Sequence, residues 1–343
     1  MRYRTIAGTN IEVSEVGFGV WTVSTGWWGD FSDEDAVTLL RQGFDRGINF
    51  FDTADTYGNG RGETILAQAF PGADRDDIVI ATKFGYDWES RIGKRREGHQ
   101  EAPHRFEPDF LERALEGSLR RLGTDRIDCY QLHNARMEHL LNDDVWTFLD
   151  KARQAGKVRT VGVALGPAIG WLDEGLYAIR ELPVEVVHTI YNALELDPGR
   201  MLIEAADAYG KSLLVRVPHS SGMLEGNYTI DTVFDEDDHR RHRPRSWLVN
   251  GLKKIEQLDF LTEATRGTLG QAALRYILKD DVIAGTFPNI YELAQIEEFV
   301  GASECADVGA DAAARVEALY EDNYGLPREQ EAAQPARRQG VSA

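Results

Sequence analysis

The 343-residue sequence has only two cysteines, Cys129 and Cys305, which are far apart in the chain. No Cys-x-x-Cys pair or Cys/His spacing typical of a metal site is present. This scarcity argues against a disulfide framework and predicts a reducing compartment. Cys129 stands in the apolar run RIDCYQLH and is predicted to be a small residue of the core.

Two kinds of targeting signal are also lacking. The first 19 residues contain no apolar h-region of a signal peptide, and no apolar run is long enough for a transmembrane helix. We therefore expect a soluble, cytoplasmic protein.

Lysine is scarce as well. Only 8 of the 38 basic residues are Lys, the other 30 are Arg, and 57 residues are Asp or Glu. The formal net charge of −19 repels phosphate backbones and anionic lipids, which argues against nucleic-acid and membrane partners. A surface rich in acid and poor in Lys fits a protein kept soluble at high salt, and equally an ordinary acidic cytosolic protein.

Continuous β-branched runs alternate with amphipathic helical stretches along the chain. Strict alternation with eight strands favours an α/β fold of the (β/α)8 TIM-barrel type. A doubly wound sheet is the alternative, and it is disfavoured because no Gly-x-Gly-x-x-Gly turn follows an early strand. The predicted strands are residues 15–19, 48–52, 77–83, 126–133, 158–164, 184–192, 212–218 and 281–287.

Residues 3–19 alternate around an AGTN turn and predict a short N-terminal β-hairpin leading into the first strand. We expect a single barrel domain over residues 1–325 and a disordered C-terminal tail over residues 326–343, which lack any periodicity. Two long polar segments, residues 84–108 and 222–250, are expected to be loops.

Four polar side chains follow or end consecutive predicted strands. Asp52 ends the second strand, with Tyr57 in the following loop, while Lys83 ends the third and His133 the fourth. In a (β/α)8 barrel such strand ends gather at one face, so an acid, a phenol, an amine and an imidazole converge there. Each residue alone is more often a loop anchor or a core residue, but all four together indicate a catalytic site.

This set of groups suits reduction of a carbonyl. A phenol is a weak acid at neutral pH, and a nearby ammonium favours its ionised form. A carboxylate beside Lys83 would hold the ammonium charged and aimed, and the imidazole could orient a carbonyl oxygen. None of the four supplies a hydride, so a cofactor must.

With these residues in order, the sequence resembles the aldo-keto reductase superfamily over roughly residues 1–325. The stretches that carry the resemblance are YRTIAGTNIEVSEVGFG, NFFDTADTYGNGRGE, IATK, IDCYQLHN, GKVRTVGV and IYN. The resemblance implies a (β/α)8 barrel that binds NADP(H) or NAD(H) in extended form. It also implies that Asp52, Tyr57, Lys83 and His133 form the catalytic tetrad, while Asp55 is structural.

The chain departs from the family pattern where the nicotinamide would bind. Ala164 and Leu165 replace the common Ser-Asn pair, and His188 replaces a Gln, so His188 is expected to contact the carboxamide. Arg216 stands where many members stack an aromatic ring, and a planar guanidinium can stack too. A structural ion pair is the alternative for Arg216.

The resemblance places further cofactor contacts after the seventh and eighth strands. Ser220 and Gly222 are expected at the pyrophosphate, and Thr286, Asn289 and Gln295 at the adenosine end. Members that prefer NADP(H) carry Lys or Arg near the eighth strand for the 2′-phosphate, but AGTFPNIYELAQIEEF has none. Preference for NAD(H), or dual specificity, is therefore a live hypothesis.

Substrate contacts are predicted from the loops around the same face. Trp21, beside the first strand end, is expected to contact both substrate and cofactor, and Trp27 to form an apolar wall or merely to pack its loop. Asn134 is expected at the substrate, and Glu63 either touches substrate or anchors its loop. The predicted partner is a small carbonyl or alcohol compound.

Two other functions stay open. A cofactor-sensing regulatory subunit with little turnover shares this fold and would bind the dinucleotide as a signal. A metal-dependent sugar isomerase would need several inward carboxylates and His ligands, whereas only Asp52 and Glu63 accompany His133. We predict no metal site, because Lys83 among these groups would repel a cation.

Overall fold

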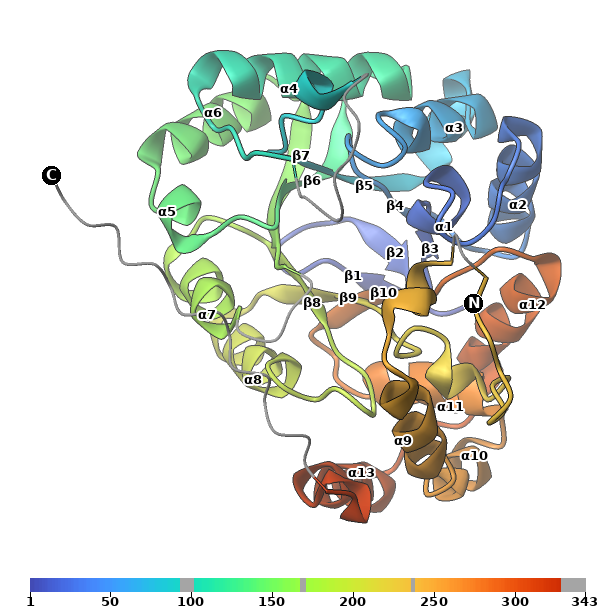
Figure 1. The fold of residues 1–343 in the computed structure, drawn as a ribbon. Coiled ribbons are helices and arrows are strands. Elements are labelled where there is room, and N and C mark those ends of the chain that lie inside the picture. Colours follow the sequence, from blue (N-terminus) through green and yellow to red (C-terminus); the bar gives the residue numbers. More distant parts are fainter. Residues whose placement is uncertain (93–101, 167–170, 236–237, 328–343) are drawn as a thin grey trace, which may run out of the picture.

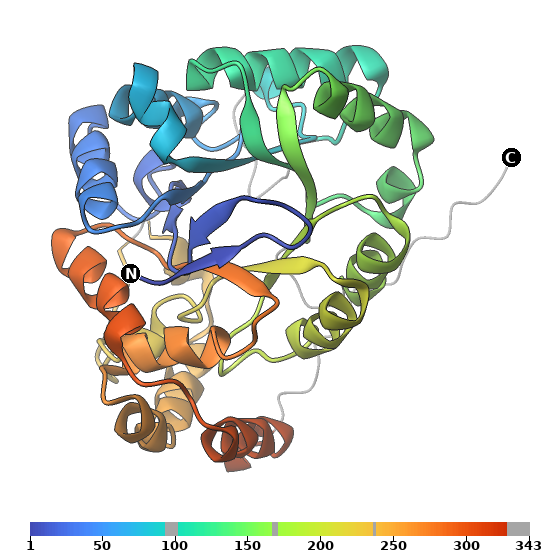
Figure 2. The ribbon, with the colours of Figure 1, turned by 180° about the vertical axis from the view of Figure 1, so that it is seen from behind.

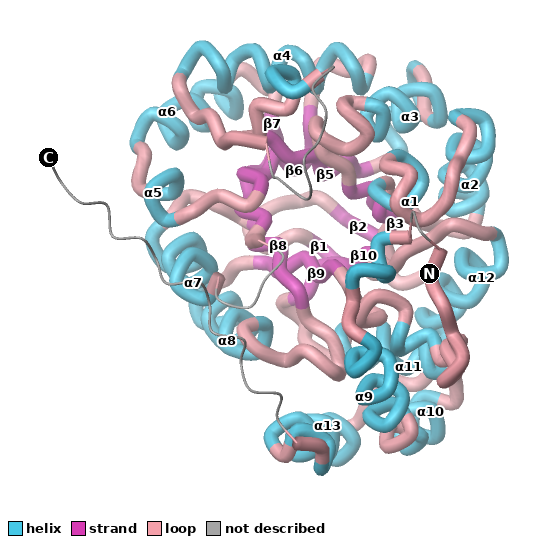
Figure 3. The backbone as a smooth tube through the Cα atoms, in the orientation of Figure 1, coloured by secondary structure: helices cyan, strands magenta, loops and turns pink. Residues whose placement is uncertain are grey.

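A computed structural model of the chain describes residues 1–92, 102–166, 171–235 and 238–327. Eight parallel strands form one sheet in the order β10-β9-β8-β7-β6-β5-β4-β3, and helices surround it on the outside (Figures 1 and 3). The strands are β3 (Phe18–Gly19), β4 (Phe50–Asp52), β5 (Val79–Phe84), β6 (Ile127–His133), β7 (Val158–Ala164), β8 (Val186–Ile190), β9 (Ser212–Arg216) and β10 (Ile283–Phe287).

The sheet closes on itself next to β3. The Thr286 N–H donates to the carbonyl of Glu15 at 3.0 Å, and the Gly17 N–H donates to the carbonyl of Thr286 at 2.9 Å. This pairing joins the last strand to the segment that leads into the first, so the sheet has no open edge there. The predicted (β/α)8 barrel is confirmed.

Helices alternate with the strands along the chain, as the sequence predicts. Ser32 caps α2, because its hydroxyl accepts the Asp35 N–H at 3.1 Å. The long helices are α2 (Asp33–Asp45), α3 (Arg61–Ala69), α4 (Pro108–Leu122), α6 (Asp143–Gln154), α7 (Leu172–Glu181), α8 (Gly199–Tyr209), α11 (Leu269–Ile277), α12 (Leu293–Gly301) and α13 (Ala310–Glu321).

Four further helices were not predicted: α1 (Trp21–Ser24), α5 (Met137–Leu140), α9 (Arg245–Ile255) and α10 (Asp259–Thr265). The prediction of a loop over residues 222–250 is therefore wrong for its last six residues, because α9 begins at Arg245. Residues 93–101 and 236–237 of the two expected loops lie outside the described residues, as does the expected tail from residue 328 onward. No helix within the described ranges is long and apolar enough to cross a bilayer.

The predicted hairpin, β1 (Tyr3–Thr5) and β2 (Glu12–Ser14), lies across the N-terminal end of the barrel (Figure 2). Its apolar residues Ile6, Ile11 and Val13 are buried in one cluster with residues from inside the barrel. The strand residues of that cluster are Phe50, Val79, Ala81, Cys129, Val186, Leu214, Ala284 and Phe287. The hairpin therefore closes the lower end of the barrel, and the prediction that Cys129 is a core residue is confirmed.

Charged side chains fix the hairpin to the last part of the barrel. The Arg4 guanidinium donates to the carbonyls of Leu278, Asp280 and Ile283 at 2.5, 3.0 and 2.9 Å. Because these carbonyls flank β10, the N-terminal hairpin is held by residues more than 270 positions later in the chain.

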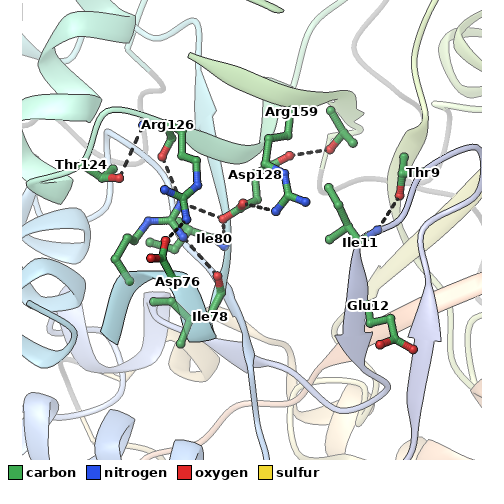
Figure 4. Close-up of polar contacts among 12 residues, drawn as sticks. Thr9, Ile11, Glu12, Asp76, Ile78, Ile80, Thr124, Arg126, Asp128 and Arg159 are labelled. Carbon is green, nitrogen blue, oxygen red and sulfur yellow. Dashed lines mark hydrogen bonds and ion pairs between the residues drawn. The ribbon is translucent and has the colours of Figure 1, made fainter. Parts of the chain in front are cut away.

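Asp128 joins three neighbouring strands near their beginnings (Figure 4). Its fully buried carboxylate accepts from Arg75 at 2.7 Å, from the Ile80 N–H at 2.9 Å and from Arg159 at 2.8 Å. Two cations and a backbone donor thus offset the cost of burying this charge. The cluster lies on β6 five residues before His133, and we assign it to stability.

Inside the barrel, apolar residues change to polar ones toward the strand ends. Residues two positions apart on a strand point to the same side of the sheet. A residue two positions after a residue of the inner apolar cluster therefore also faces the barrel interior. The inward pairs are Phe50 and Asp52, Ala81 and Lys83, Cys129 and Gln131, Val186 and His188, and Leu214 and Arg216. The apolar core is therefore the floor of a polar layer at the mouth of the barrel.

Candidate active site

Lys83 is the centre of the polar layer. Its ammonium donates to both carboxylate oxygens of Asp52, at 2.8 and 2.6 Å, to the Thr53 carbonyl at 2.7 Å, and to the Tyr57 hydroxyl at 3.3 Å. Burial alone lowers the pKa of this amine, but the Asp52 carboxylate and the Tyr57 phenol outweigh it, so the pKa lies above its ordinary value. Lys83 therefore stays charged and is held in three directions at once.

A tight turn places Tyr57 above this ion pair. Gly58, Asn59 and Gly60 have φ values of +59°, +57° and +90°, which suit glycine and asparagine. A Cβ on Gly58 would lie 2.3 Å from the Ser24 carbonyl oxygen, so only glycine fits this turn without a shift. The half-buried Tyr57 ring thus approaches Lys83 from the loop, and Asp52 and Lys83 approach from their strands.

His133 lies beside Tyr57, with 5.8 Å between the ring centroids and an angle of 77°. Burial, with the nearby charges of Lys83 and Arg216, lowers the pKa of His133 well below its ordinary value. The imidazole is therefore neutral at physiological pH and can donate or accept a hydrogen bond. The structure brings together all four residues of the predicted tetrad.

Two residues that the sequence did not single out hold His133 and Asn134. The Asn134 amide donates to the Tyr86 hydroxyl at 2.9 Å, and Nε2 of His104 donates to the His133 carbonyl at 2.8 Å. The Tyr86 ring stacks on His104, with 4.2 Å between centroids, and meets His133 edge-on. The Asn134 amide nitrogen is therefore engaged by Tyr86, whereas its buried Oδ1 has no partner among the described residues.

His188, on β8, lies beside Asp52 and Phe287. Nδ1 of His188 lies 3.8 Å from Asp52 Oδ1, and its ring centroid lies 5.4 Å from that of Phe287. Neither ring nitrogen of His188 has a hydrogen-bond partner among the described residues. Burial lowers the pKa of His188 well below its ordinary value, so this ring is neutral too.

Arg216 spans the mouth from the end of β9. Its guanidinium donates to the Leu165 carbonyl, just beyond β7, and its buried Nε has no partner among the described residues. Burial lowers the pKa of this group, while Tyr57 and Asp52 oppose that change. Within the described residues no carboxylate pairs with Arg216, so the ion-pair interpretation finds no support.

Glu63 lies behind the tetrad, in the first turn of α3, and is fully buried. Its carboxylate accepts from the Thr82 hydroxyl and from Arg121 Nε, both at 2.7 Å. These contacts join α3 to β5 and α4, which supports the anchoring alternative for Glu63. Asp55 is buried nearby, and burial raises its pKa well above the ordinary value, with Glu63 adding to the effect.

Aromatic side chains form one rim of the mouth. Trp21 and Trp28 meet edge-on with 6.2 Å between ring centroids, and Trp28 stacks on Tyr291 at 6.0 Å. The guanidinium of Arg240 lies 4.3 Å above Trp28, so the segment between β9 and α9 reaches across to the rim near α1 (Figure 1). Trp21 and Trp27 are half-buried.

The residues after β9 form a strained turn. Ser220, Ser221 and Gly222 have φ values of +47°, +58° and +90°, and the N–H groups of Ser221 and Gly222 donate to no described residue. Arg243 donates to the Ser221 hydroxyl at 3.2 Å, and its buried Nε has no described partner. Free N–H groups beside an arginine suit an anion.

The residues predicted at the adenosine end differ in exposure. Gln295 is buried, with its side chain accepting the Tyr291 N–H at 2.9 Å and donating to Glu225 at 3.4 Å, and Asn289 is half-buried. Thr286 is fully buried, and its hydroxyl has no described partner. Because Phe287 faces the barrel interior, the Thr286 side chain points away from it.

Tyr86, His104, Glu225 and Arg243 are therefore additional residues of this region. Each lies in a polar loop after a strand, and no spacing in the sequence relates it to its partner. The only available signal was their position after strands β5 and β9, where barrels carry their functional groups.

Comparison with known proteins agrees with this geometry. Residues 15–321 match the model of the Aldo/keto reductase family. The chain is 30% identical over 302 residues to the Schizosaccharomyces pombe aldo-keto reductase yakc [NADP(+)], covering 85% of this chain and 84% of that protein. It is 26% identical over 320 residues to an NADH-specific methylglyoxal reductase of Escherichia coli, covering 91% and 96%.

A solved structure shows the same relationship. The holo form of a Bacillus halodurans aldo-keto reductase superposes with a TM-score of 0.72 at 25% identity, covering 93% of this chain and 96% of that one. The family model spans most of the chain, and its match includes the strands that carry Asp52, Lys83 and His133. The chain belongs to the aldo-keto reductase family and is an NAD(P)-dependent oxidoreductase.

Proposed function

We propose that the protein interconverts small carbonyl compounds and their alcohols, with Tyr57 as the general acid and base. The observation that supports this role most directly is the Lys83 ammonium, 3.3 Å from the Tyr57 hydroxyl and paired with Asp52. The ammonium donates to the phenol oxygen, so the phenol's own proton is left to point at a substrate oxygen. The positive charge also stabilises the phenolate that remains after proton transfer.

The other groups orient the substrate. His133, being neutral, can donate a hydrogen bond to the same carbonyl oxygen without competing for its proton. We propose Trp21, Trp27 and Asn134 as contacts of the substrate that Tyr57 protonates. The anchoring contacts of Glu63 give it a supporting role behind the tetrad.

The described residues fit a dinucleotide lying from the mouth along the turn after β9. Arg216 and His188 offer unpartnered buried nitrogens near Tyr57, where the nicotinamide would bind. Ser220 to Gly222, with Arg243, suit the pyrophosphate, and Gln295 suits the adenosine. When bound, the reduced nicotinamide supplies the hydride, and Tyr57 supplies the proton that completes the alcohol.

The test is oxidation of reduced cofactor, followed at 340 nm, with NADH and NADPH assayed separately against aldehydes, ketones and sugar aldehydes. Tyr57→Phe removes only the transferable proton, so kcat should fall by about 10²–10⁴-fold while the dinucleotide still binds. Tyr209→Phe is the matched control, because it removes an exposed phenol hydroxyl at the end of α8, on the outside of the barrel, and should leave proton transfer intact.

A regulatory, cofactor-sensing role predicts another result. The wild type would then bind the dinucleotide with little turnover on any carbonyl, and Tyr57→Phe would change nothing measurable. Turnover in the wild type that Tyr57→Phe abolishes would exclude this second function.

A further inference from the structure

Arg216 brings a positive charge to the mouth of the barrel that no carboxylate among the described residues balances. The side chain is half-buried, and its only hydrogen bond to a described residue runs from Nη2 to the Leu165 carbonyl. Its Nε is buried without a described partner. A guanidinium remains protonated at neutral pH even where burial lowers its pKa, so this charge is permanent.

The other groups of the polar layer leave the charge of Arg216 uncompensated. Lys83 and Asp52 form an ion pair, with 2.6 Å between Nζ and Oδ2, and their charges cancel. His133 and His188 are neutral, because burial lowers the pKa of each well below its ordinary value. Among the described residues of this layer, positive charge is therefore in excess, although the formal net charge of the whole chain is −19.

Arg216 also lies where the nicotinamide has to pass. The turn proposed for the pyrophosphate begins at Ser220, four residues after Arg216, and the hydride must reach a carbonyl carbon whose oxygen contacts Tyr57. The guanidinium is near enough to Tyr57 and Asp52 for their charges to interact. A ring that extends from the turn after β9 to Tyr57 therefore lies close to this cation.

The two redox forms of the cofactor differ in charge at this ring. The oxidised nicotinamide is a cation and the reduced one is neutral, whereas the phosphates are the same in both forms. A fixed cation beside the ring repels the oxidised form, and burial weakens the screening of that repulsion by water and salt. The acidic surface acts in the opposite direction, because the reduced dinucleotide carries one more negative charge overall.

Resting on the proposed function, we propose that Arg216 makes the protein bind the reduced dinucleotide more tightly than the oxidised one. Alcohol oxidation breaks the substrate C–H bond and transfers its hydride to the ring, while the hydroxyl proton passes to Tyr57. The ring loses its positive charge in this step, so Arg216 favours carbonyl and reduced cofactor among the bound species. An aromatic side chain at this position carries no charge and would exert no such bias.

The experiment measures the dissociation constants of the oxidised and the reduced dinucleotide by titration calorimetry at neutral pH, so no substrate or turnover is needed. NAD+ is compared with NADH, and NADP+ with NADPH. We expect the wild type to bind the reduced form at least about tenfold more tightly. That ratio equals about 30 mV in the reduction potential of the bound two-electron couple.

Three variants separate charge from shape and from position. Arg216→Gln should bring the two dissociation constants to within about threefold of each other, whereas Arg216→Lys should keep most of the preference. Arg243→Gln is the control, because it removes a cation at the proposed pyrophosphate turn, where both redox forms carry the same charges. It should weaken the binding of both forms and leave their ratio within about twofold of the wild-type value.

The inference is wrong if the wild type binds both redox forms equally tightly, a result that requires no variant to fold. It is also wrong if Arg216→Lys loses the preference as fully as Arg216→Gln, because shape would then be responsible, or if Arg243→Gln shifts the ratio as much. If no dinucleotide binds the wild type, the proposed function itself fails and the inference with it. Equal binding of both redox forms overturns the inference alone and leaves that function intact.

Discussion

The Lys83 ammonium lies 2.6 Å from Oδ2 of Asp52, and the two side chains are 0% and 8% exposed. A pair buried this deeply has exchanged two hydration shells for a few fixed contacts, and either partner alone would be an uncompensated charge. The pair therefore links catalysis to stability, because the same contact that charges Lys83 beside Tyr57 also keeps the mouth of the barrel folded.

Replacing Lys83 by Met should lower the free energy of unfolding by about 3–5 kcal/mol, since Asp52 then stays buried without its partner. Adding Asp52→Asn should recover much of that loss, because no unpaired charge remains. Neither protein should reduce carbonyls, as both lack the ammonium beside Tyr57. Chemical denaturation and the 340 nm assay measure the two effects, and a double variant less stable than Lys83→Met would contradict this account.

Replacing Glu63 by Gln should separate its anchoring role from contact with substrate. The change weakens the charged bond to Arg121, and we expect a loss of about 1.5–3 kcal/mol in the free energy of unfolding. The KM for a carbonyl substrate should stay nearly unchanged. A large rise in KM at unchanged thermal stability would show instead that Glu63 binds substrate.

Glu225 should make stability depend on pH. Its folded pKa is about 7, against an ordinary 4.5, so the folded protein holds a proton between these values that the unfolded chain releases. The stabilising effect is complete below pH 4.5 and is lost as the pH rises through 7, by up to about 3 kcal/mol.

The measurement is the difference in unfolding free energy between wild type and Glu225→Gln across that range. His219 titrates in both proteins and cancels in the difference. A difference that stays flat from pH 4.5 to 7 would contradict the raised pKa.

Replacing Asp128 by Ala should destabilise the protein without affecting the chemistry. Arg75, Arg159 and the Ile80 N–H would lose their shared acceptor, at a cost of about 3–5 kcal/mol. Because Asp128 lies at the opposite end of β6 from His133, kcat should stay close to the wild-type value at temperatures where the variant is folded. Thermal unfolding and the 340 nm assay, run on the same sample, check both parts.

The barrel and the tetrad could be predicted because both follow from order along the chain. Eight alternating units predict closure, and residues that end parallel strands meet at one face, so Asp52, Lys83 and His133 needed no knowledge of distant contacts. The helices α9 and α10 were missed because they are inserted between β9 and α11, outside the alternation of one strand with one helix.

Contacts between loops could not be predicted from the order of elements along the chain. Glu225 and Gln295 are 70 positions apart, and their meeting depends on how the turn after β9 folds, which no local pattern encodes. The orientation of Thr286 was likewise hidden, because the register of β10 shifts between Ile283 and Gly285. A shift of one residue moves a side chain from one face of a strand to the other.

The way the barrel is sealed has a consequence for biosynthesis. Glu15 and Gly17 pair with Thr286, and Arg4 bonds to carbonyls at Leu278 and beyond, so these contacts of the first residues cannot form before the residues of β10 have been made. Contacts between such distant positions slow folding, because a long loop must close before they form. The barrel cannot close on the ribosome until β10 has emerged. Until then the hairpin and the early strands expose apolar surface, which chaperones can bind and which can cause aggregation.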